Sequence, residues 1–396
     1  MNIIFFDDDT RINLLPLTYT RPVCDLRLGI LTIREKWEKQ LSVKSSTLTE
    51  SYLREKFPLV ITDDNLFVNA CVLPDEGLLQ AIKNLKAGSR LVYEDFVLAI
   101  RSGKDTPKDL QQFSEIPGTD IISYSGKISR LKYCWDLFAM NEQAIADDFK
   151  VLTAGRKSQS ISTSNKCIQA ENIFLEEGVR VECAILNASA GPIYLAKDSE
   201  VMEGAMIRGP FSLGEHAQVK MGAKIYGATT IGPECRVGGE VSNSVMLGYS
   251  NKGHDGFLGN SVLGEWCNLG ADSNNSNLKN NYSKIKVWSY KDDDYINTGL
   301  QFCGLIMGDH SKCSINTMFN TGTVVGVSAN IYGNGFPPKF VPSFAWGGSE
   351  GFKTYRIEEA QEVAQRVYER RKLEFNVIEQ KILKYLFEYT TKYRSW

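Results

Sequence analysis

One histidine stands in a polar segment whose residue types could support proton transfer. His254 is one of three histidines in the chain, and lysine, asparagine and aspartate side chains flank it in residues 251–260. An imidazole can take a proton from an attacking amine near neutral pH, which is the task of a general base in N-acyl transfer. The alternative is a solvated loop histidine. We interpret His216 and His310 as structural.

The first forty residues carry arginines that could bind phosphate. Arg11, Arg21, Arg27 and Arg34 follow an acidic run at residues 7–9. Guanidinium groups bind phosphate oxygens through charge-assisted hydrogen bonds. Several of them near one loop would make an anion pocket. For Arg34, a surface charge on a helix is an equal alternative.

Two carboxylates could hold a metal ion. Asp63 and Asp64 directly follow the apolar run 59–61, which we expect to be a strand. Ligands of α/β domains bind outside the carboxyl ends of the strands, and carboxylates there can ligate Mg²⁺. A capping or turn role is equally compatible with one of the two.

A six-residue repeat predicts the element that must position His254. Aliphatic residues recur at that spacing, and a mostly small residue follows each of them four places later. An α-helix repeats about every 3.6 residues and a strand every 2, so neither explains the pattern. A hexad repeat is typical of a parallel β-helix, whose core takes one aliphatic side chain per hexad. The aliphatic series is Leu195, Val201, Ile207, Leu213, Val219, Ile225, Ile231 and Val237.

The repeat is interrupted around His254. It is regular to Val241, breaks over residues 242–256 and resumes at Phe257. Successive coils stack about 4.8 Å apart, so we expect residues of such a break to leave the wall as a loop and to line a cleft. A polar insertion follows at residues 273–300, after which the repeat returns.

The remaining segments predict an α/β domain and a C-terminal helix. Short apolar runs at 3–6 and 59–61 alternate with helical patterns at 29–40 and 78–85, which indicates a Rossmann-like domain with a mostly parallel sheet. The last segment has apolar residues at helical spacing. We expect an N-terminal domain at 1–130, a connecting helix and linker at 131–165, the β-helix at 166–350 and an amphipathic α-helix at 351–396.

Composition and charge exclude several classes of protein. A chain of 396 residues is too long for one ordinary core. The net charge of −2 provides no general surface for nucleic acid. Nine scattered cysteines without a C-x-x-C pair indicate reduced thiols. Without a signal peptide or an apolar run of membrane-spanning length, we expect a cytoplasmic protein that does not bind membranes.

The segment around His254 resembles a known family. Gly253-His254, Leu258-Gly259-Asn260, Leu263-Gly264 and Asn268-Leu269-Gly270-Ala271 are similar to the acetyltransferase domain of the bifunctional N-acetylglucosamine-1-phosphate uridyltransferase/glucosamine-1-phosphate acetyltransferase family, which is a left-handed parallel β-helix. The resemblance implies that His254 is the general base and that acetyl-CoA is the co-substrate. It also implies contacts to the acceptor or to acetyl-CoA from Lys224, Asn268, Ala271 and Asn277.

Two positions depart from that family. Ser242 stands where the family has a phosphate-binding lysine, and Phe257 replaces a tyrosine that binds the same phosphate. The loss of a cation and a hydroxyl donor should weaken recognition of a sugar 1-phosphate. We expect Lys252 to substitute for the missing cation.

The N-terminal segment resembles the sugar nucleotidyltransferases. Thr10-Arg11, Pro16-Leu17-Thr18 and Arg21-Pro22 match their first loop, and the run through Leu26-Arg27 to Trp37 matches a divergent branch. The resemblance implies a nucleoside triphosphate (UTP or dTTP) and a hexose 1-phosphate as substrates, with Mg²⁺ as cofactor. Thr10, Arg11, Arg21 and Arg27 would bind phosphate, and Asp63 or Asp64 would bind the metal. The acidic residues 7–9 replace the loop glycines of the family, and carboxylates repel phosphate.

Together the two resemblances imply a two-domain enzyme of sugar-nucleotide biosynthesis. It would transfer a nucleotidyl group to a hexose 1-phosphate, as in UDP-N-acetylglucosamine formation, and would N-acetylate an amino-sugar phosphate. One alternative is a nucleotidyltransferase only, of the glucose-1-phosphate thymidylyltransferase type, with a structural or regulatory β-helix. The other is a degenerate nucleotide-sugar-binding trimer. β-Helix acyltransferases build their sites between adjacent prisms, so we expect a homotrimer.

Overall fold

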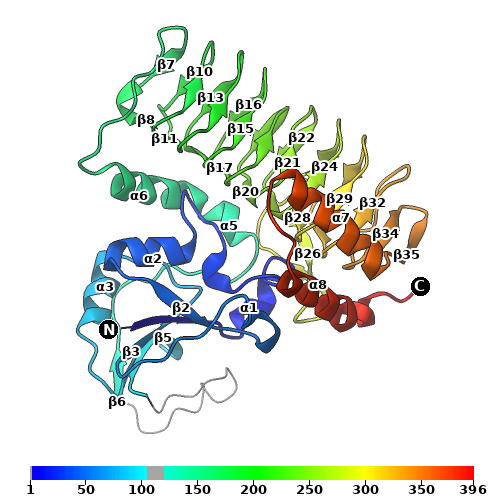
Figure 1. The fold of residues 1–396 in the computed structure, drawn as a ribbon. Coiled ribbons are helices and arrows are strands. Elements are labelled where there is room, and N and C mark those ends of the chain that lie inside the picture. The colour runs from blue at the N-terminus through cyan, green and yellow to red at the C-terminus, as the bar shows by residue number, and fades with distance from the viewer. Residues whose placement is uncertain (1, 105–119) are drawn as a thin grey trace. The chain divides into compact units, whose positions relative to one another are not determined.

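The chain forms two compact units. The computed structural model describes residues 2–104 and 120–396 (Figure 1). Unit 1 comprises Met1–Leu14, Thr20–Leu26 and Leu31–Tyr133, and unit 2 comprises Leu15–Tyr19, Arg27–Ile30 and Cys134–Trp396. The domain boundaries drawn from the sequence stay predictions. Within the described ranges, no helix is long and apolar enough to cross a membrane.

Unit 1 is built on a mixed six-stranded sheet with the order β2-β1-β3-β5-β4-β6. Strand β1 pairs in parallel with β2 and β3, and β4 pairs in parallel with β6, whereas β5 runs antiparallel to both β3 and β4. Among the described strands, five therefore run in the same direction and β5 runs against them, so the sheet is mostly parallel, as predicted, with one antiparallel strand. Its strands are β1 (Asn2–Phe6), β2 (Ser45–Leu48), β3 (Asn65–Asn69), β4 (Ser89–Tyr93), β5 (Phe96–Ser102) and β6 (Asp120–Ser123). Its helices are α1 (Thr10–Asn13), η1 (Val23–Asp25), α2 (Ile33–Leu41), η2 (Ser51–Leu53) and α3 (Glu76–Lys83).

The strand expected at residues 59–61 is absent, and that prediction was wrong. The backbone of Val60 bonds to side chains instead of a ladder, since its amide donates to Ser46 Oγ (3.1 Å) and its carbonyl accepts from Asn2 Nδ2 (2.7 Å). Leu59 and Ile61 still pack against the core of the sheet. Apolar content alone does not distinguish such a packed loop from a strand.

Unit 2 contains a parallel β-solenoid with three walls, which confirms the predicted β-helix. The walls contain six, nine and ten strands. The first wall consists of β7 (Lys166–Ile168), β10 (Ile185–Asn187), β13 (Met206–Arg208), β16 (Lys224–Tyr226), β19 (Glu240–Ser242) and β22 (Phe257–Gly259). The second wall consists of β8 (Ile173–Leu175), β11 (Ile193–Leu195), β14 (Phe211–Leu213), β17 (Thr229–Ile231), β20 (Val245–Gly248), β23 (Val262–Glu265), β28 (Leu305–Met307), β31 (Thr323–Val325) and β33 (Phe340–Val341). The third wall consists of β9 (Arg180–Val181), β12 (Glu200–Val201), β15 (Gln218–Val219), β18 (Arg236–Val237), β21 (Asn251–Lys252), β24 (Asn268–Leu269), β29 (Lys312–Cys313), β32 (Asn330–Ile331), β34 (Ala345–Gly348) and β35 (Gly351–Thr354).

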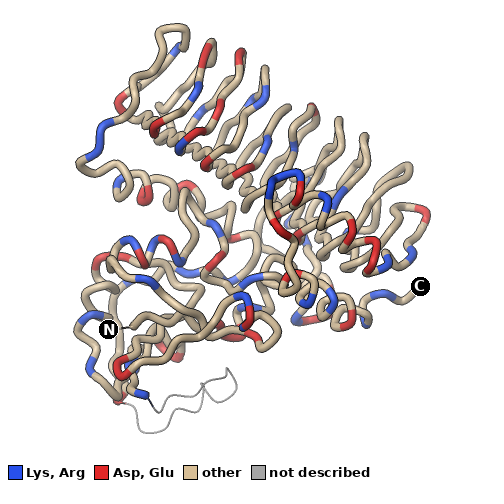
Figure 2. The backbone as a smooth tube through the Cα atoms, in the orientation of Figure 1, with Lys and Arg blue, Asp and Glu red and all other residues tan. Residues whose placement is uncertain are grey.

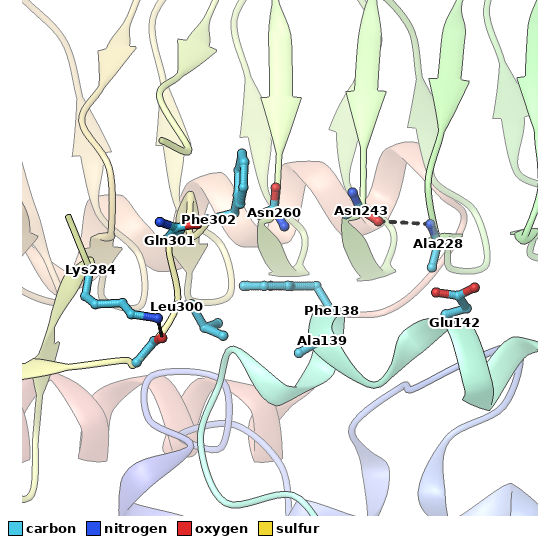
Figure 3. Close-up of a pocket in the computed structure, with 11 residues that line it drawn as sticks. Phe138, Ala139, Glu142, Ala228, Asn243, Asn260, Lys284, Leu300, Gln301 and Phe302 are labelled. Carbon is cyan, nitrogen blue, oxygen red and sulfur yellow. Dashed lines mark hydrogen bonds between the residues drawn. The ribbon is translucent and has the colours of Figure 1, made fainter. Parts of the chain in front are cut away.

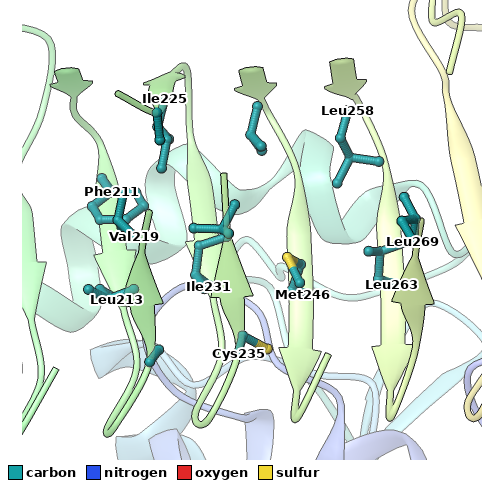
Figure 4. Packing of buried hydrophobic residues seen from close by; sticks show 14 of the residues in the cluster. Phe211, Leu213, Val219, Ile225, Ile231, Cys235, Met246, Leu258, Leu263 and Leu269 are labelled. Atoms are coloured by element: carbon teal, nitrogen blue, oxygen red, sulfur yellow. The ribbon is translucent and has the colours of Figure 1, made fainter. Parts of the chain in front are cut away.

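The hexad aliphatic residues form the core of the solenoid. Leu213, Val219, Ile225 and Ile231 are all buried and point into its interior (Figure 4). Parallel pairing holds equivalent positions in register, as for Leu213 with Ile231. Each coil therefore buries one aliphatic side chain per wall, which stabilises the stack by the hydrophobic effect.

The break in the repeat is not a loop, which corrects the expectation for residues 242–256. Strands β20 and β21 continue the second and third walls through this segment. Lys252 pairs in register with Val237, so it occupies an aliphatic position of the ladder. The hexad pattern is lost because this coil is shorter and places a lysine in the core.

Further elements flank the solenoid within unit 2. The connecting segment forms α5 (Asp136–Ala139) and α6 (Asn141–Thr153), and α6 contacts β17. The polar insertion contains β25 (Asn274–Asn275), which pairs with β30 (Met318–Phe319), and the hairpin of β26 (Lys286–Ser289) and β27 (Asp294–Asn297). The C-terminal segment forms α7 (Ile357–Arg370), α8 (Val377–Tyr389) and η4 (Thr390–Tyr393). The 3-10 turn η3 (Ala170–Asn172) precedes β8.

Candidate functional site

His254 lies at a corner of the solenoid, between β21 of the third wall and β22 of the first. Its side chain is exposed, and its imidazole forms no hydrogen bond or ion pair with the part of the chain that the structure describes. An imidazole that is exposed and not engaged elsewhere is available to a substrate. The site residue predictions remain untested, and the structure shows which of them lie together.

A cavity of about 670 Å³ adjoins His254, and we call it the basic pocket. Asn268 and Ala271, two further predicted residues, line it beside His254. Its volume is in the range of small-molecule sites. Five basic side chains line it, and no Asp or Glu occurs among the described residues that do so; the five are Lys220, Arg236, Lys312, Arg370 and Arg371.

The cations of the basic pocket act on one another. Burial and the neighbouring Arg236 lower the pKa of the Lys220 ammonium. The same two causes, in that order, lower the pKa of the Arg371 guanidinium. Burial also lowers the pKa of the Lys312 ammonium, to about 8. A low-dielectric pocket that concentrates like charges favours an anion.

Helix α7 is fixed against the solenoid at this pocket. Tyr368 of α7 stacks on Trp266 with ring centroids 4.0 Å apart, and Tyr249 stacks on the same indole at 4.2 Å. Arg371 Nη1 pairs with Glu234 at 3.0 Å. These contacts hold the basic end of α7, where Lys and Arg gather in Figure 2, over the third wall.

Lys252, expected to substitute for a phosphate-binding cation, points into the solenoid. Its side chain is 2% exposed, and Nζ donates to the carbonyls of His254 and, at 3.0 Å, Asp255. Burial lowers the pKa of the Lys252 ammonium to about 8. This lysine therefore holds the turn that carries His254, and the geometry does not support a contact with the acceptor.

The phosphate clamp of the resembling family aligns with three positions of the first wall, namely Lys224, Ser242 and Phe257. Lys224 and Phe257 each pair in register with Glu240, which stands two residues before Ser242. Lys224 Nζ lies 3.9 Å from Glu240, whose carboxylate partly neutralises it. This rung offers a phosphate one cation with a carboxylate beside it.

Asn277 does not line the basic pocket. Its side-chain amide donates to Asn260 Oδ1 at 2.8 Å, and Asn260 lines a second cavity of about 390 Å³ (Figure 3). Glu142 and Lys284 are the charged residues that line this cavity, and Lys284 Nζ already donates to Gly299 O at 2.6 Å. None of the predicted site residues is among the described residues that line the second cavity.

In unit 1, acidic side chains occupy the carboxyl edge of the parallel strands. Asp7 follows β1 and is buried, accepting hydrogen bonds from Thr49 Oγ1 (2.6 Å) and the amide of Val23 (2.9 Å). Burial raises the pKa of the Asp7 carboxyl to about 6. Asp8 accepts from Asn69 Nδ2 (2.8 Å) and from the amide of Thr10 (2.9 Å).

The predicted phosphate-binding arginines have different surroundings. Arg11 is buried, with Nε 3.4 Å from Asp7 Oδ2, and it donates to Tyr52 Oη at 2.9 Å. Arg21 is buried as well. Arg27 belongs to unit 2, where its guanidinium donates to Leu247 O (3.3 Å) and Ile30 O (2.5 Å).

Arg34 has a structural role. Its guanidinium pairs with both oxygens of Asp25, at 2.6 and 3.0 Å, and also donates to Ser45 Oγ (2.8 Å) and Thr47 Oγ1 (2.5 Å). These bonds connect α2, η1 and β2. Thr10 and Arg11, by contrast, lie close to the carboxyl end of β1, where they bond to Asp8 and Asp7.

The predicted metal ligands do not fit a magnesium ion. Asp64 makes a bidentate pair with Arg101 at 2.8 and 3.0 Å, and Arg101 lowers the pKa of the Asp64 carboxyl. Asp63 pairs with Lys104 at 2.5 Å. Among the described residues, no three His, Cys, Asp or Glu side chains group in a way that could hold a metal ion. The prediction of Asp63 and Asp64 as ligands therefore has no support from this geometry.

The basic residues of the pocket were not predicted from the sequence. Arg236 directly precedes the core residue Val237. On the third wall, Arg236 is in register with four other polar residues, namely Gln218, Asn251, Asn268 and Lys312. A polar column one place before the aliphatic series could have indicated this face. The arginines of α7 had no such signal, because the place of a helix end depends on tertiary packing.

Comparison with known proteins finds a family similar to the N-terminal part of the chain. Residues 3–157 match a family model described as sugar nucleotidyl transferase. Over 93 residues, the chain is 32% identical to a bifunctional sugar-1-phosphate nucleotidylyltransferase/acetyltransferase of Sulfurisphaera tokodaii. The match covers 24% of this chain and 23% of that relative, so the chain spans less than a quarter of the relative's length.

A structural comparison finds the UDP-N-acetylglucosamine acyltransferase of Arabidopsis. The match covers 53% of this chain and 82% of that one, with 15% identity and a TM-score of 0.25. At that TM-score the similarity carries no conclusion about this chain.

Proposed function

We propose that this protein is a transferase of sugar-nucleotide biosynthesis with two activities. The N-terminal domain would transfer a nucleotidyl group from UTP or dTTP to a hexose 1-phosphate, and the solenoid would transfer an acetyl group from acetyl-CoA to an amino sugar. The nucleotidyl transfer is supported by the family match of residues 3–157. The observation that carries the acyl transfer is the exposed His254 beside the basic pocket. The nine free cysteines are those expected of a cytoplasmic enzyme.

Acyl transfer at His254 needs few groups. The acceptor amine attacks the thioester carbonyl carbon, the new C–N bond forms, and the C–S bond breaks as the thiolate leaves. His254 accepts the proton that the amine loses and can return it to the thiolate. Asn268 lines the same pocket and can orient the acceptor through its amide.

The proposal is tested by removing the imidazole. His254→Ala should lower the rate of acetyl transfer from acetyl-CoA to glucosamine 1-phosphate by at least a hundredfold, because general-base catalysis contributes about 10²–10⁴-fold. Pyrophosphate release from UTP or dTTP with a hexose 1-phosphate should not change. The measurement is a thiol-release assay beside a pyrophosphate assay.

His216→Ala is the matched control, since His216 is also exposed on the solenoid but lines neither cavity. It should acetylate at the wild-type rate. A His254→Ala protein that acetylates as fast as His216→Ala would remove His254 from the mechanism. If the wild-type protein shows no acetyl transfer, the alternative that it is a nucleotidyltransferase only would be favoured.

A second candidate applies to unit 1, which would then bind a nucleotide sugar without catalysis. It is favoured by the buried pair of Arg11 and Asp7, because the carboxylate competes with a phosphate for the guanidinium. Since Asp63 and Asp64 do not fit Mg²⁺, we derive no step through a metal. Binding of UDP-N-acetylglucosamine without pyrophosphate release from any nucleoside triphosphate would support this candidate.

A further inference from the structure

The basic pocket is lined by five cations and, among the described residues, by no Asp or Glu, although Arg371 pairs with Glu234 outside the lining. Arg236 is partly buried, and its guanidinium forms no hydrogen bond or ion pair with the described parts of the chain. Its charged neighbours Lys220 and Arg371 are cations, and Arg236 acts on both of them by repulsion. Clustering like charges in a partly buried cavity is unfavourable unless an anion neutralises them.

The geometry of the pocket is preformed. Asn251 Oδ1 accepts from Arg371 at 3.4 Å and Glu234 pairs with the same guanidinium, so Arg371 is held by residues of the solenoid. The stack of Tyr368 on Trp266 fixes α7 as well. A ligand would therefore not have to order these side chains, which lowers the entropic cost of binding.

We propose that the basic pocket binds the phosphate group of a small phosphorylated ligand, with Arg236, Lys220 and Arg371 as its cations. A phosphate dianion matches several cations at once, and the planar guanidinium donates two parallel hydrogen bonds to it. The cavity of about 670 Å³ accommodates a small molecule and not a polymer. The phosphate is thus held on the third wall, and not on the first-wall rung of Lys224 and Phe257.

This inference deepens the proposed function and rests on it only in placing the phosphate near His254. Two ligands of acyl transfer carry phosphates, namely a phosphorylated acceptor and the nucleotide part of acetyl-CoA. Both His254 and Arg236 line the pocket, so either source is compatible with its lining. Separate probes distinguish them.

The test is isothermal titration of the full chain with glucosamine 1-phosphate and, separately, with adenosine 3′,5′-bisphosphate. We expect wild-type protein to bind at least one probe with a Kd below 1 mM and to bind it more weakly at 0.5 M NaCl. Arg236→Ala should raise that Kd at least tenfold. An effect on the sugar phosphate assigns the site to the acceptor, and an effect on the bisphosphate assigns it to the acyl donor.

Arg180→Ala is the matched control, since Arg180 is exposed on the third wall and lines neither cavity. It should bind as the wild type does. If circular dichroism shows that Arg236→Ala is unfolded, Lys220→Met tests the same pocket. The inference is overturned if wild-type protein binds neither probe, or if Arg236→Ala and Lys220→Met both bind like Arg180→Ala.

His254→Ala separates this inference from the proposed function. It should lose acetyl transfer, and it should still bind the probe at least tenfold more tightly than the double variant His254→Ala/Arg236→Ala does. Probe binding that depends on Arg236 in a protein without acetyl transfer would support the phosphate site and reject the proposed activity. Acetyl transfer that does not depend on Arg236 would support the proposed activity and reject the phosphate site.

Discussion

Lys252 shows how one buried charge can serve a functional turn. Its ammonium lies in the core ladder, where Val237 occupies the neighbouring rung, and it donates to the carbonyls of residues 254 and 255. Burial lowers its pKa to about 8 from an ordinary value of 10.5. The folded protein therefore tolerates the charged form at an energetic cost, offset in part by the two hydrogen bonds.

The pKa of Lys252 predicts a pH dependence of stability. Below pH 8 the amine is charged in both folded and unfolded chains, and the burial penalty is fully present. Between pH 8 and 10.5 the folded chain loses the proton first, so its stability rises relative to a variant without the amine. The free energy of unfolding of wild type minus that of Lys252→Met should increase across this window by up to about 3 kcal/mol.

The measurement is urea unfolding at pH 7.0, 8.5 and 10, following the solenoid by circular dichroism. Lys353→Met is a suitable control, because Lys353 is exposed on β35. A difference between wild type and Lys252→Met that is flat with pH, like that of the control, would show that Lys252 ionises as it does in the unfolded chain.

At the scale of elements, α2 begins at a capping box. Thr32 Oγ1 accepts from the amide of Glu35 at 3.1 Å, and Glu35 Oε2 accepts from the amide of Thr32 at 2.7 Å. Thr32→Ala should therefore lower the local stability of α2 by about 1 kcal/mol, since it leaves a helix amide without its partner. Hydrogen exchange of the α2 amides measures this change. Thr32→Ser keeps the hydroxyl and should restore protection, and equal protection in both variants would contradict the role of the cap.

The start of α2 is an example of a feature that the sequence encodes but that was placed at the wrong residue. The Thr32-x-x-Glu35 signature was present, but the helix was placed at 29–40 from its apolar face. The hexad repeat predicted the solenoid well because one aliphatic position per wall is a local requirement. Lys252 broke that pattern and concealed a coil that continues through it.

The candidate site was harder to predict than the fold. His254, Asn268 and Ala271 lie near one another in sequence and share one pocket. Arg370 and Arg371 reach the same pocket from a helix more than a hundred residues later, through stacking that no local pattern encodes. Asn277 was expected in the site, but it does not line the basic pocket and instead bonds to Asn260, which lines the second cavity.

At the scale of the whole molecule, the first wall carries an exposed apolar face. Four large apolar side chains of its outer surface are each 40–44% exposed, namely Ile168, Ile185, Met206 and Tyr226. Ile185 and Met206 are adjacent rungs of the ladder. Covering such a face would stabilise an assembly, because burial of a large apolar side chain contributes about 1.5–3 kcal/mol.

We therefore expect a homotrimer that uses this face of the first wall. Light scattering at micromolar concentration should give three times the chain mass of 44.3 kDa. Met206→Glu should shift the protein towards monomer, because a glutamate in a dry interface would be an unpaired buried charge. Val377→Glu is the control, since Val377 is exposed at the start of α8, and it should remain trimeric. A monomeric wild type would reject the trimer, and a Met206→Glu protein that remains trimeric would place the interface on another face.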